Sequence, residues 1–495
     1  MSETRRFTKN YVFMVLGYFM NFGIGAVTML FIGWGLSVKD FGVFTYAVTI
    51  TGLSSIIGQA GTGPYALAYV PRHRGEAASF LASSNGLRLY MALPMMLLLL
   101  GYNLASSASP MVIAAVMIIG VGAVVQLEVM FFRDFFRSVE MNPQGTMVLV
   151  FRGLCNVAGV IVWYVLFRGS LMSLVVVWMA SQVPAMFVGG WAIRKHICPV
   201  GLDLRPQSSW DIVKVSYMFA IVNLLILAPG TIETIMLKIF IGADTAQIGY
   251  FQIGIRLMGL SAVLSTNIEE TFKPVVSRKF GESPEAFRAT VHRVHKFCFF
   301  SGVPAYIFTA VFAQDILWCL FGTKYLPAAD LLRIICLGAI IRDMPPIYMI
   351  FHMTGLQRYG FRIGAVMLAL QVAVGLMLFP KFGMWGAAWS VPIVNLASKI
   401  QTVVYYWRRR YPVIASVRPL IVSAVLAAGV TGLCWLLRCW LGGGWPGLVA
   451  SGLTFLALVA AGHLVAVLDK DDRRVLREAM AGVMGKFRRV TGAAS

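Results

Sequence analysis

Charged residues are scarce in this chain. They make up 13% of its 495 residues, whereas hydrophobic residues make up 58%. A soluble domain carries roughly 25% charged residues, so this composition excludes an ordinary soluble protein. The apolar residues gather in repeated runs of roughly 20 residues, the length that crosses a bilayer. The chain is therefore predicted to be an all-α polytopic membrane protein.

Residues that bind metals or form disulfides are also few, with seven cysteines and six histidines. Cys434 and Cys439 lie on one predicted helix at a spacing that is poor for a disulfide. His292 and His295 form an H-x-x-H pattern at the start of another predicted helix, where a solvated helix face is the favoured interpretation. The sequence predicts no metal site, no bound cofactor and no catalytic residue.

The apolar runs predict fourteen membrane spans. Residues 1–10 carry Arg5, Arg6 and Lys9, and the run that follows them is long enough to be a first span rather than a cleaved leader. The predicted spans are 11–36, 41–67, 80–104, 110–132, 144–167, 171–193, 211–240, 249–272, 288–312, 328–353, 358–379, 386–407, 417–438 and 447–468.

The distribution of basic residues tests this count. With both termini in the cytoplasm, most of the 42 Lys and Arg residues fall on or near the inner segments, as the positive-inside rule requires. A missed helix would invert every later loop and spoil the asymmetry. The net charge of +21 is thus explained by topology and by contact with anionic membrane lipids, and it does not indicate nucleic-acid binding.

Two segments at equivalent hairpins resemble each other. GLSVKDFGVFTYAVTITGLS at 35–54 matches GADTAQIGYFQIGIRLMGLS at 242–261. The identical pairs keep one constant offset: Gly35/Gly242, Gly42/Gly249, Phe44/Phe251, Gly52/Gly259, Leu53/Leu260 and Ser54/Ser261. Two six-helix lobes related by a parallel repeat are expected, with a central cavity between them.

The repeat also sets the predicted domains. They are an N-terminal lobe at 1–193, a cytoplasmic linker at 194–210, a C-terminal lobe at 211–410, two additional transmembrane helices at 411–468 and a cytoplasmic tail at 469–495. The tail alternates apolar and basic residues at helical spacing, which predicts an amphipathic helix on the inner leaflet. No predicted outer loop is long enough for a catalytic domain, so an enzyme is not expected.

Four charged residues lie deep in the second lobe. A charge at the bilayer centre costs about 2.5–3.5 kcal/mol, so it usually faces a cavity or a partner. Arg256 and Glu233 lie at similar depth on adjacent helices, where an ion pair is plausible. Arg342 and Asp343 are followed by Pro345 and Pro346, which predict a kink just beyond the pair. For both arginines a role facing the cavity is favoured over a purely structural one.

The first lobe holds Arg88, Arg152 and Glu128 within or near its spans. Both arginines are candidates for substrate contact near the inner side, and snorkelling to the membrane surface remains an equal alternative. The three carboxylates Glu233, Asp343 and Glu128 are predicted to neutralise arginines or to couple transport to an ion. Pro229 predicts a bend in the seventh span, where either a gating hinge or a static kink is expected.

Three motifs resemble those of polysaccharide flippases: DFGVFTY at 40–46, FGTKYLPAADLLRIICLG at 321–338 and FGMWGAAW at 382–389. Their order and positions are similar to the Wzx-like polysaccharide transport family of the multidrug/oligosaccharidyl-lipid/polysaccharide (MOP) exporter superfamily. The resemblance implies a flippase that moves an undecaprenyl-diphosphate-linked oligosaccharide across the cytoplasmic membrane by alternating access. It implies lipid-linked oligosaccharide as substrate, with arginines such as Arg256 and Arg342 on the diphosphate. A polysaccharide polymerase and glycosyltransferases are the expected protein partners.

Departures from related families leave alternatives open. Cation-coupled drug exporters often keep an acidic residue in the first helix, and none occurs between Tyr11 and Leu36. Peptidoglycan-precursor (lipid II) flippases cluster arginines on the first, second and eighth helices, and only Arg256 has a counterpart here, with Thr49 at its repeat-equivalent position. Coupling to H⁺ or Na⁺, a lipid II-type flippase, an exporter of small amphipathic molecules and a scaffold or enzyme of polysaccharide assembly remain alternatives.

Overall fold

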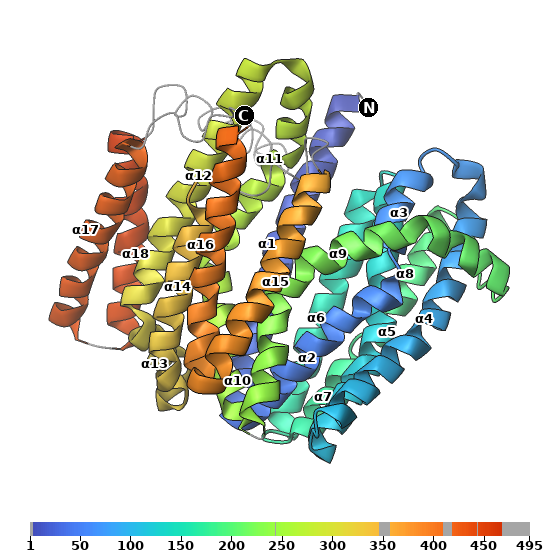
Figure 1. Ribbon diagram of the computed structural model, residues 1–495, viewed down its shortest axis with the longest axis horizontal. Coiled ribbons are helices and arrows are strands. Elements are labelled where there is room, and N and C mark those ends of the chain that lie inside the picture. The colour runs from blue at the N-terminus through green and yellow to red at the C-terminus, as the bar shows by residue number, and fades with distance from the viewer. Residues whose placement is uncertain (1–2, 243, 346–356, 409–417, 443, 468–495) are drawn as a thin grey trace, which may run out of the picture. The chain divides into compact units, whose positions relative to one another are not determined.

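The computed structural model describes residues 3–242, 244–345, 357–408, 418–442 and 444–467 (Figure 1). Helices account for nearly all of these residues, and no strand occurs among them. The predicted tail at 469–495 lies outside the described part of the chain. The chain forms two compact units, residues 1–252 with 364–387 and residues 253–363 with 388–495. The second unit thus begins within the repeated segment.

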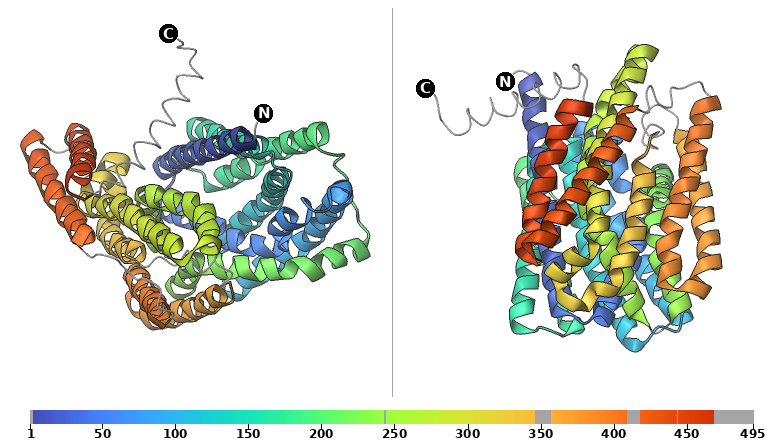
Figure 2. Two further views of the ribbon diagram at one scale, coloured as in Figure 1. Left: turned by 90° about the horizontal axis from the view of Figure 1, so that it is seen from above. Right: turned by 90° about the vertical axis from the view of Figure 1, so that its left-hand side faces the viewer.

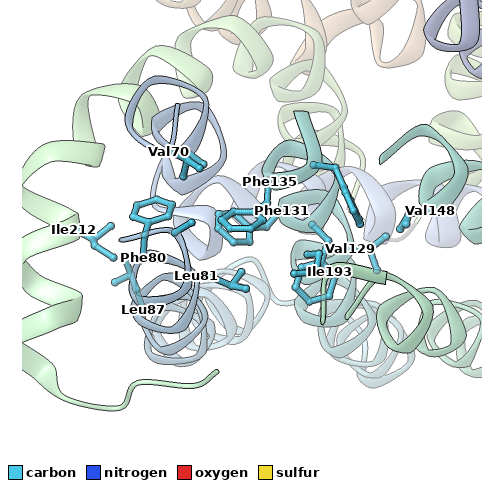
Figure 3. Packing of buried hydrophobic residues seen from close by; sticks show 14 of the residues in the cluster. Val70, Phe80, Leu81, Leu87, Val129, Phe131, Phe135, Val148, Ile193 and Ile212 are labelled. Carbon is cyan, nitrogen blue, oxygen red and sulfur yellow. The ribbon is translucent and has the colours of Figure 1, made fainter. Parts of the chain in front are cut away.

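The helices of the first unit begin with α1 (Glu3–Gly35), a helix that packs along α6. The others are α2 (Val38–Gln59), α3 (Thr62–Tyr69), α4 (Ala77–Ala105), α5 (Pro110–Ser138), α6 (Asn142–Leu166), α7 (Leu171–Ala180), α8 (Val183–His196) and α9 (Pro206–Ile241). Phe131 and Phe135 of α5 lie at the centre of its core, with Phe80 and Leu81 of α4 among their neighbours (Figure 3). Aromatic packing therefore fixes α5 between α4 and α8.

The second unit contains α11 (Val263–Glu282), α12 (Pro284–Val311), α13 (Ala313–Phe321), α14 (Ala329–Asp343), α17 (Arg418–Leu441) and α18 (Trp445–Gly462). Three helices have residues in both units: α10 (Thr245–Ser261), α15 (Gln357–Phe382) and α16 (Met384–Arg408). The additional helices α17 and α18 lie side by side, and both contact helices of this unit (Figure 2). An ion pair of 2.5 Å between Arg438 and Asp315 ties α17 to α13.

Thirteen of the fourteen predicted spans coincide with a helix or with a broken pair of helices, whereas the tenth, at 328–353, matches α14 only as far as Asp343. Nine helices among the described residues are long and apolar enough to cross a membrane, or up to eleven if each strongly bent pair is one span. The polytopic all-α class predicted from composition is therefore confirmed. The span that joins α2 and α3 breaks at Ala60 and Gly61, which both have positive φ angles.

The break between α2 and α3 has a packing reason. A Cβ atom on Gly61 would lie 2.1 Å from the carbonyl oxygen of Ser216, so α9 passes against the bare backbone of this turn. Ser216 in turn donates a hydrogen bond of 2.7 Å to the carbonyl oxygen of Ala60. The break is therefore a docking site for α9, which a continuous helix would not provide.

The seventh predicted span is bent as expected. Helix α9 changes direction by 66° between Pro206–Leu225 and Gly230–Ile241, the two sides of Pro229 (Figure 1). Proline lacks the backbone N–H that continues the helical ladder, and a glycine follows it. The bend predicted at Pro229 is confirmed, whereas its role as a gating hinge stays a prediction.

The tenth predicted span differs from expectation. The sequence predicts a helix over 328–353 that kinks at Pro345 and Pro346, but α14 ends at Asp343. Met344 is already extended, with φ −61° and ψ 139°, because a residue before proline is forced out of the helical region. The predicted kink is thus a helix end, and Pro346 lies outside the described residues.

The predicted linker between the lobes is held against α4. Asn85 donates a hydrogen bond of 2.8 Å to the carbonyl oxygen of Gly201, and the Asp203 amide donates one of 3.0 Å to that of Ala82. A Cβ on Gly86 would lie 1.8 Å from the Asp203 oxygen, so glycine is needed for this approach. The segment is therefore a packed part of the first unit rather than a free tether.

The two copies of the repeat meet in the first unit through equivalent atoms. A Cβ on Gly42 would lie 1.8 Å from the carbonyl oxygen of Thr245, and one on Gly249 would lie 2.4 Å from that of Val38. Val38 and Thr245 are themselves equivalent positions of the repeat. The contact is thus reciprocal, as expected between two copies related by a pseudo-two-fold axis. It explains why both copies keep glycine at this position.

Replacement of either contact glycine by alanine is expected to destabilise the protein. In Gly42→Ala or Gly249→Ala, the added methyl group would force the two helices apart, a change that typically costs about 1–3 kcal/mol. Gly52→Ala is the matched control, because this repeat glycine has nothing within 4 Å of the added Cβ. Thermal unfolding of the purified proteins measures the effect, and equal melting temperatures for the contact variants and the control would contradict it.

The anchoring of the linker is expected to be insensitive to pH near neutrality. Arg205 donates two side-chain hydrogen bonds and its backbone N–H to Asp203, and it holds the pKa of that carboxyl well below its usual range. A carboxylate with a lowered pKa contributes above its unfolded pKa of about 3.9, and this contribution is lost only as pH falls through the lower folded value. Proteolysis of the linker should therefore be constant between about pH 5 and 8.

Asp203→Asn is expected to accelerate that cleavage several-fold, because it removes the charge that orients Arg205. Asp211→Asn is the control, since the exposed Asp211 pairs with Lys214 and accepts from Gln207, both on α9 itself. Unchanged cleavage of the Asp203 variant would show that the backbone contacts alone hold the linker.

Candidate functional site

The best-defined polar network of the first unit surrounds Arg88 on α4. Its guanidinium donates to both carboxylate oxygens of Glu128, over 3.0 Å from Nε and 2.7 Å from Nη2, and also to Asn85. The ring of Phe131 lies 3.7 Å from the guanidinium carbon. Only 1% of the Arg88 side chain is exposed. Bidentate pairing with a cation–π contact is a strong arrangement for a buried arginine.

This geometry shows Arg88 joining α4 to α5 in a packed interior. Its predicted contact with a substrate stays a prediction, whereas the alternative of snorkelling to the membrane surface does not describe this enclosed side chain. Glu128 has the predicted role of charge partner, and 21% of its side chain remains exposed. It borders an apolar crevice with Leu89, Phe132 and Trp191.

A second basic cluster lies where α5 ends and α6 begins. Arg133 and Arg137 of α5 share the carboxylate of Asp134, at 2.8 Å and 3.7 Å. Arg152 of α6 was predicted from its depth in the sequence, and its guanidinium lies near enough to Arg133 for mutual repulsion. Sequence reasoning missed Arg133 and Arg137, although two arginines one helical turn apart around a single carboxylate are a readable signal.

The charged cluster of the second unit is built on the end of α14. Arg342 Nε donates to Asp343 over 2.9 Å, and Arg342 Nη2 donates to the Tyr306 hydroxyl over 2.9 Å. That hydroxyl donates to the other oxygen of Asp343 over 2.8 Å. The three groups form a closed triangle between α12 and α14. Asp343 is buried, whereas 42% of the Arg342 side chain is exposed.

Neighbouring helices complete this second-unit cluster. Lys399 of α16 donates a hydrogen bond of 3.0 Å to the Arg342 carbonyl oxygen, which caps the end of α14. Glu269 of α11 lies close enough to attract Arg342 electrostatically. A Cβ on Gly302 would lie 2.5 Å from an Asp343 oxygen, so the bare backbone of α12 makes room for the carboxylate. The arrangement holds the guanidinium in place, while part of the Arg342 side chain stays exposed.

Arg256 and Glu233 belong to different units. Glu233 is buried within α9 of the first unit. Arg256 lies in the second unit, which begins at Ile253. The Nε of Arg256 is buried and has no hydrogen-bond partner among the described residues. The ion pair between Glu233 and Arg256 therefore stays a prediction. Among the residues that the structure describes, no three His, Cys, Asp or Glu side chains gather closely enough to hold a metal ion.

The fold defines the class of protein. It is similar to "Lipid II flippase MurJ, inward closed conformation", with 12% identity, a TM-score of 0.71, and coverage of 92% of this chain and 98% of that one. It is also similar to an inward-facing MATE multidrug resistance transporter of the MOP superfamily, with 14% identity, a TM-score of 0.62 and coverage of 79% and 94%. These likenesses show the polytopic fold of the MOP exporter superfamily.

A third similar structure is the MATE multidrug transporter DinF-BH in complex with R6G, with 14% identity, a TM-score of 0.60 and coverage of 83% and 96%. Residues 7–278, more than half of the chain, match the family described as polysaccharide biosynthesis protein. The chain belongs to this family. A search among curated proteins finds no match.

Removal of one partner from the Arg88–Glu128 pair is expected to be far more damaging than removal of both. Glu128→Gln leaves a buried guanidinium without its counter-charge and should destabilise the protein by about 3–5 kcal/mol. The double change Arg88→Met with Glu128→Leu should recover most of that loss, because no charge is left buried. Thermal unfolding of the three proteins measures this, and equal losses in single and double variants would contradict a structural pair.

Proposed function

We propose that the protein is a flippase that moves an undecaprenyl-diphosphate-linked oligosaccharide from the inner to the outer leaflet of the bacterial cytoplasmic membrane. It would serve the synthesis of a surface polysaccharide. Membership of the polysaccharide biosynthesis family and the MOP fold support a lipid-linked substrate. The observation that carries the proposal is Arg342, whose guanidinium is held by Asp343 and Tyr306 and whose side chain is 42% exposed.

The physical demands of the task agree with such a site. A hydroxyl group moved into an environment without hydrogen bonds costs roughly 4–8 kcal/mol, and an oligosaccharide carries many hydroxyls. A polar path between two lobes replaces water, while the polyprenyl tail stays in the lipid. Arginine suits the diphosphate because its planar fork donates paired hydrogen bonds and keeps its charge. Arg342 and Arg256 are the residues proposed to hold it.

Alternating access needs elements that bend. The 66° bend of α9 at Pro229 and the end of α14 before Pro345 are the places proposed to change direction. A transport role without catalysis fits the transporters and flippases among the similar structures. Cytoplasmic termini, partnership with a polymerase and glycosyltransferases, and coupling to H⁺ or Na⁺ through Glu233 or Asp343 are further parts of the proposal.

A lipid II-type substrate is the second candidate. The observation in its favour is the likeness to the MurJ fold over 98% of that protein's chain. Thr49 stands against it, because the repeat-equivalent position of Arg256 carries no cation. Export of small amphipathic molecules, as in the multidrug transporters of similar fold, is a third candidate.

Deletion of the gene tests the proposed function. Lipid-linked repeat units should accumulate on the cytoplasmic face, and surface polysaccharide should fall, because the polar headgroup cannot cross unaided. Extraction and mass spectrometry of the lipid-linked intermediates, together with a polysaccharide assay, measure both. Unchanged intermediates and unchanged polysaccharide would contradict the flippase assignment, while accumulation of lipid II would favour the second candidate.

Complementation of that deletion tests the arginines. Arg256→Ala and Arg342→Ala should each lose at least about tenfold in restored polysaccharide, since a hydrogen bond to a charged group contributes about 1.5–3 kcal/mol. Arg342→Lys should rescue only partly, because a lysine lacks the paired donors. Arg168→Ala, in the exposed loop after α6, is the control. Full complementation by both alanine variants at equal expression would remove these arginines from the mechanism.

A further inference from the structure

An open crevice lies against α5 in the first unit, between α4 and α8. Leu89 of α4, Phe132 of α5 and Trp191 of α8 line it, and Leu202 of the linker adds a further wall. Its volume is about 530 Å³, within the range of roughly 300–1,000 Å³ that is typical of ligand pockets. The lining is mostly apolar, which indicates a hydrocarbon ligand rather than a sugar or a nucleotide.

Two adjacent glycines of α8 form the floor of the crevice. A Cβ on Gly189 would lie 2.8 Å from the ring of Phe132, so α8 approaches α5 through its bare backbone. A Cβ on Gly190 would lie 3.7 Å from the same ring, an ordinary contact distance. Gly190 lines the crevice, and its missing side chain leaves the space above Phe132 open.

The linker side of the crevice is held in place by α4. Asn85 donates a hydrogen bond of 2.8 Å to the carbonyl oxygen of Gly201. A Cβ on Gly201 would lie 3.1 Å from the Cβ of Ala82, so the linker packs closely on this helix. Val200 and Leu202, on either side of Gly201, are exposed and line the crevice. The wall is therefore formed before any ligand binds.

The crevice is turned away from α2, the helix that meets α9 and α10. Leu127 of α5 faces α2, where a Cβ on Gly58 would lie 2.4 Å from a Leu127 methyl carbon. Phe132 lies roughly 140° further round α5. On α8, Ile193 is buried in the core (Figure 3), whereas Trp191 is 60% exposed. The open side of the crevice therefore faces the membrane lipid.

Basic residues stand at the end of α8, beside this apolar space. Arg194 lines the crevice, and among the described residues no carboxylate pairs with it. The Lys195 ammonium lies 4.8 Å from the centre of the Trp191 ring, a cation–π contact. Glu128 also borders the crevice, but Arg88 already neutralises it. An apolar crevice with an excess of positive charge at one end matches an anionic amphipath.

We infer that the crevice binds an anionic phospholipid of the inner leaflet, with an acyl chain against Phe132 and Trp191 and the phosphate on Arg194 and Lys195. The acyl chain gives little preference, because it leaves one hydrocarbon environment for another. Selectivity comes from the basic side chains, which attract anionic headgroups at the cytoplasmic surface. Positive-inside topology places the end of α8 at that surface, and tryptophan is typical of the interface. The inference holds whatever substrate the protein transports.

Native mass spectrometry of the purified full-length protein in detergent tests the inference. Dioleoyl phosphatidylglycerol and dioleoyl phosphatidylethanolamine are titrated in turn, since they share their chains and differ in headgroup charge. The wild type should bind the anionic lipid about tenfold more tightly, because two basic side chains meet its phosphate. Arg194→Gln and Lys195→Gln should each weaken that binding by about fivefold. Arg72→Gln is the control, since Arg72 is an exposed residue of the loop after α3 and does not line the crevice.

A second pair of variants tests the apolar part of the site. Gly190→Leu fills the space above Phe132 and should weaken the binding of both phospholipids several-fold, because the acyl chain loses its place. Leucine is a better helix former than glycine, so the change favours the folded helix. Gly101→Leu on α4 is the matched control, because nothing lies within 4 Å of its added Cβ, and it should bind as the wild type does.

Three outcomes would overturn the inference. One is equal affinity of the wild type for the two phospholipids, or wild-type binding by both Gly190→Leu and the combined Arg194 and Lys195 variant. Another is a loss in Arg72→Gln as large as that in Arg194→Gln, which would show general surface attraction. The third is displacement of phosphatidylglycerol by a lower concentration of geranylgeranyl diphosphate, which would assign the crevice to a polyprenyl diphosphate. Because the measurement is lipid binding by purified protein, failure of the flippase assignment in the deletion strain would leave this result unchanged.

Discussion

The cost of a charge without a partner in an apolar interior governs this structure. Two deep arginines are held in closed networks, Arg88 by Glu128 and Arg342 by Asp343 with Tyr306, because each network replaces the water that the guanidinium has lost. The networks differ in one respect that matters for function. Arg88 is enclosed, whereas Arg342 keeps a large exposed fraction. The same physics therefore produces a structural joint in one unit and a candidate binding group in the other.

The repeat has a second consequence beyond ancestry. Gly42 and Gly249 occupy equivalent positions and each admits the other copy's backbone, so the glycines are kept because two helices cross too closely for a Cβ. Gly52 and Gly259 are equally matched in the sequence, yet open space surrounds both. A glycine shared by both copies therefore lies at a helix contact in the first pair and in open space in the second. Only the reciprocal geometry separates them.

Much of the fold was predictable, because hydropathy and charge asymmetry act locally along the chain. Thirteen of the fourteen predicted spans coincide with helices or broken helix pairs, and the bend at Pro229 follows from the missing N–H of proline. The break at Ala60 and Gly61 was not predicted, since it depends on α9 passing against that turn from far along the chain. The end of α14 at Asp343 was predicted as a kink, because proline at that place is compatible with either outcome.

For the candidate sites, the sequence by itself determined which charged residues lie within apolar segments, where burying a charge is unfavourable. It identified Arg88, Arg152, Arg256 and Arg342, because a charge within an apolar run stands out at any depth. Only the tertiary structure decided what each charge meets. Arg88 and Glu128 are brought together from different helices, Arg133 and Arg137 converge on Asp134 beside Arg152, and Tyr306 closes the triangle with Arg342 and Asp343. These partners come from different helices that pack together. Their spacing in the sequence therefore does not predict the pairing.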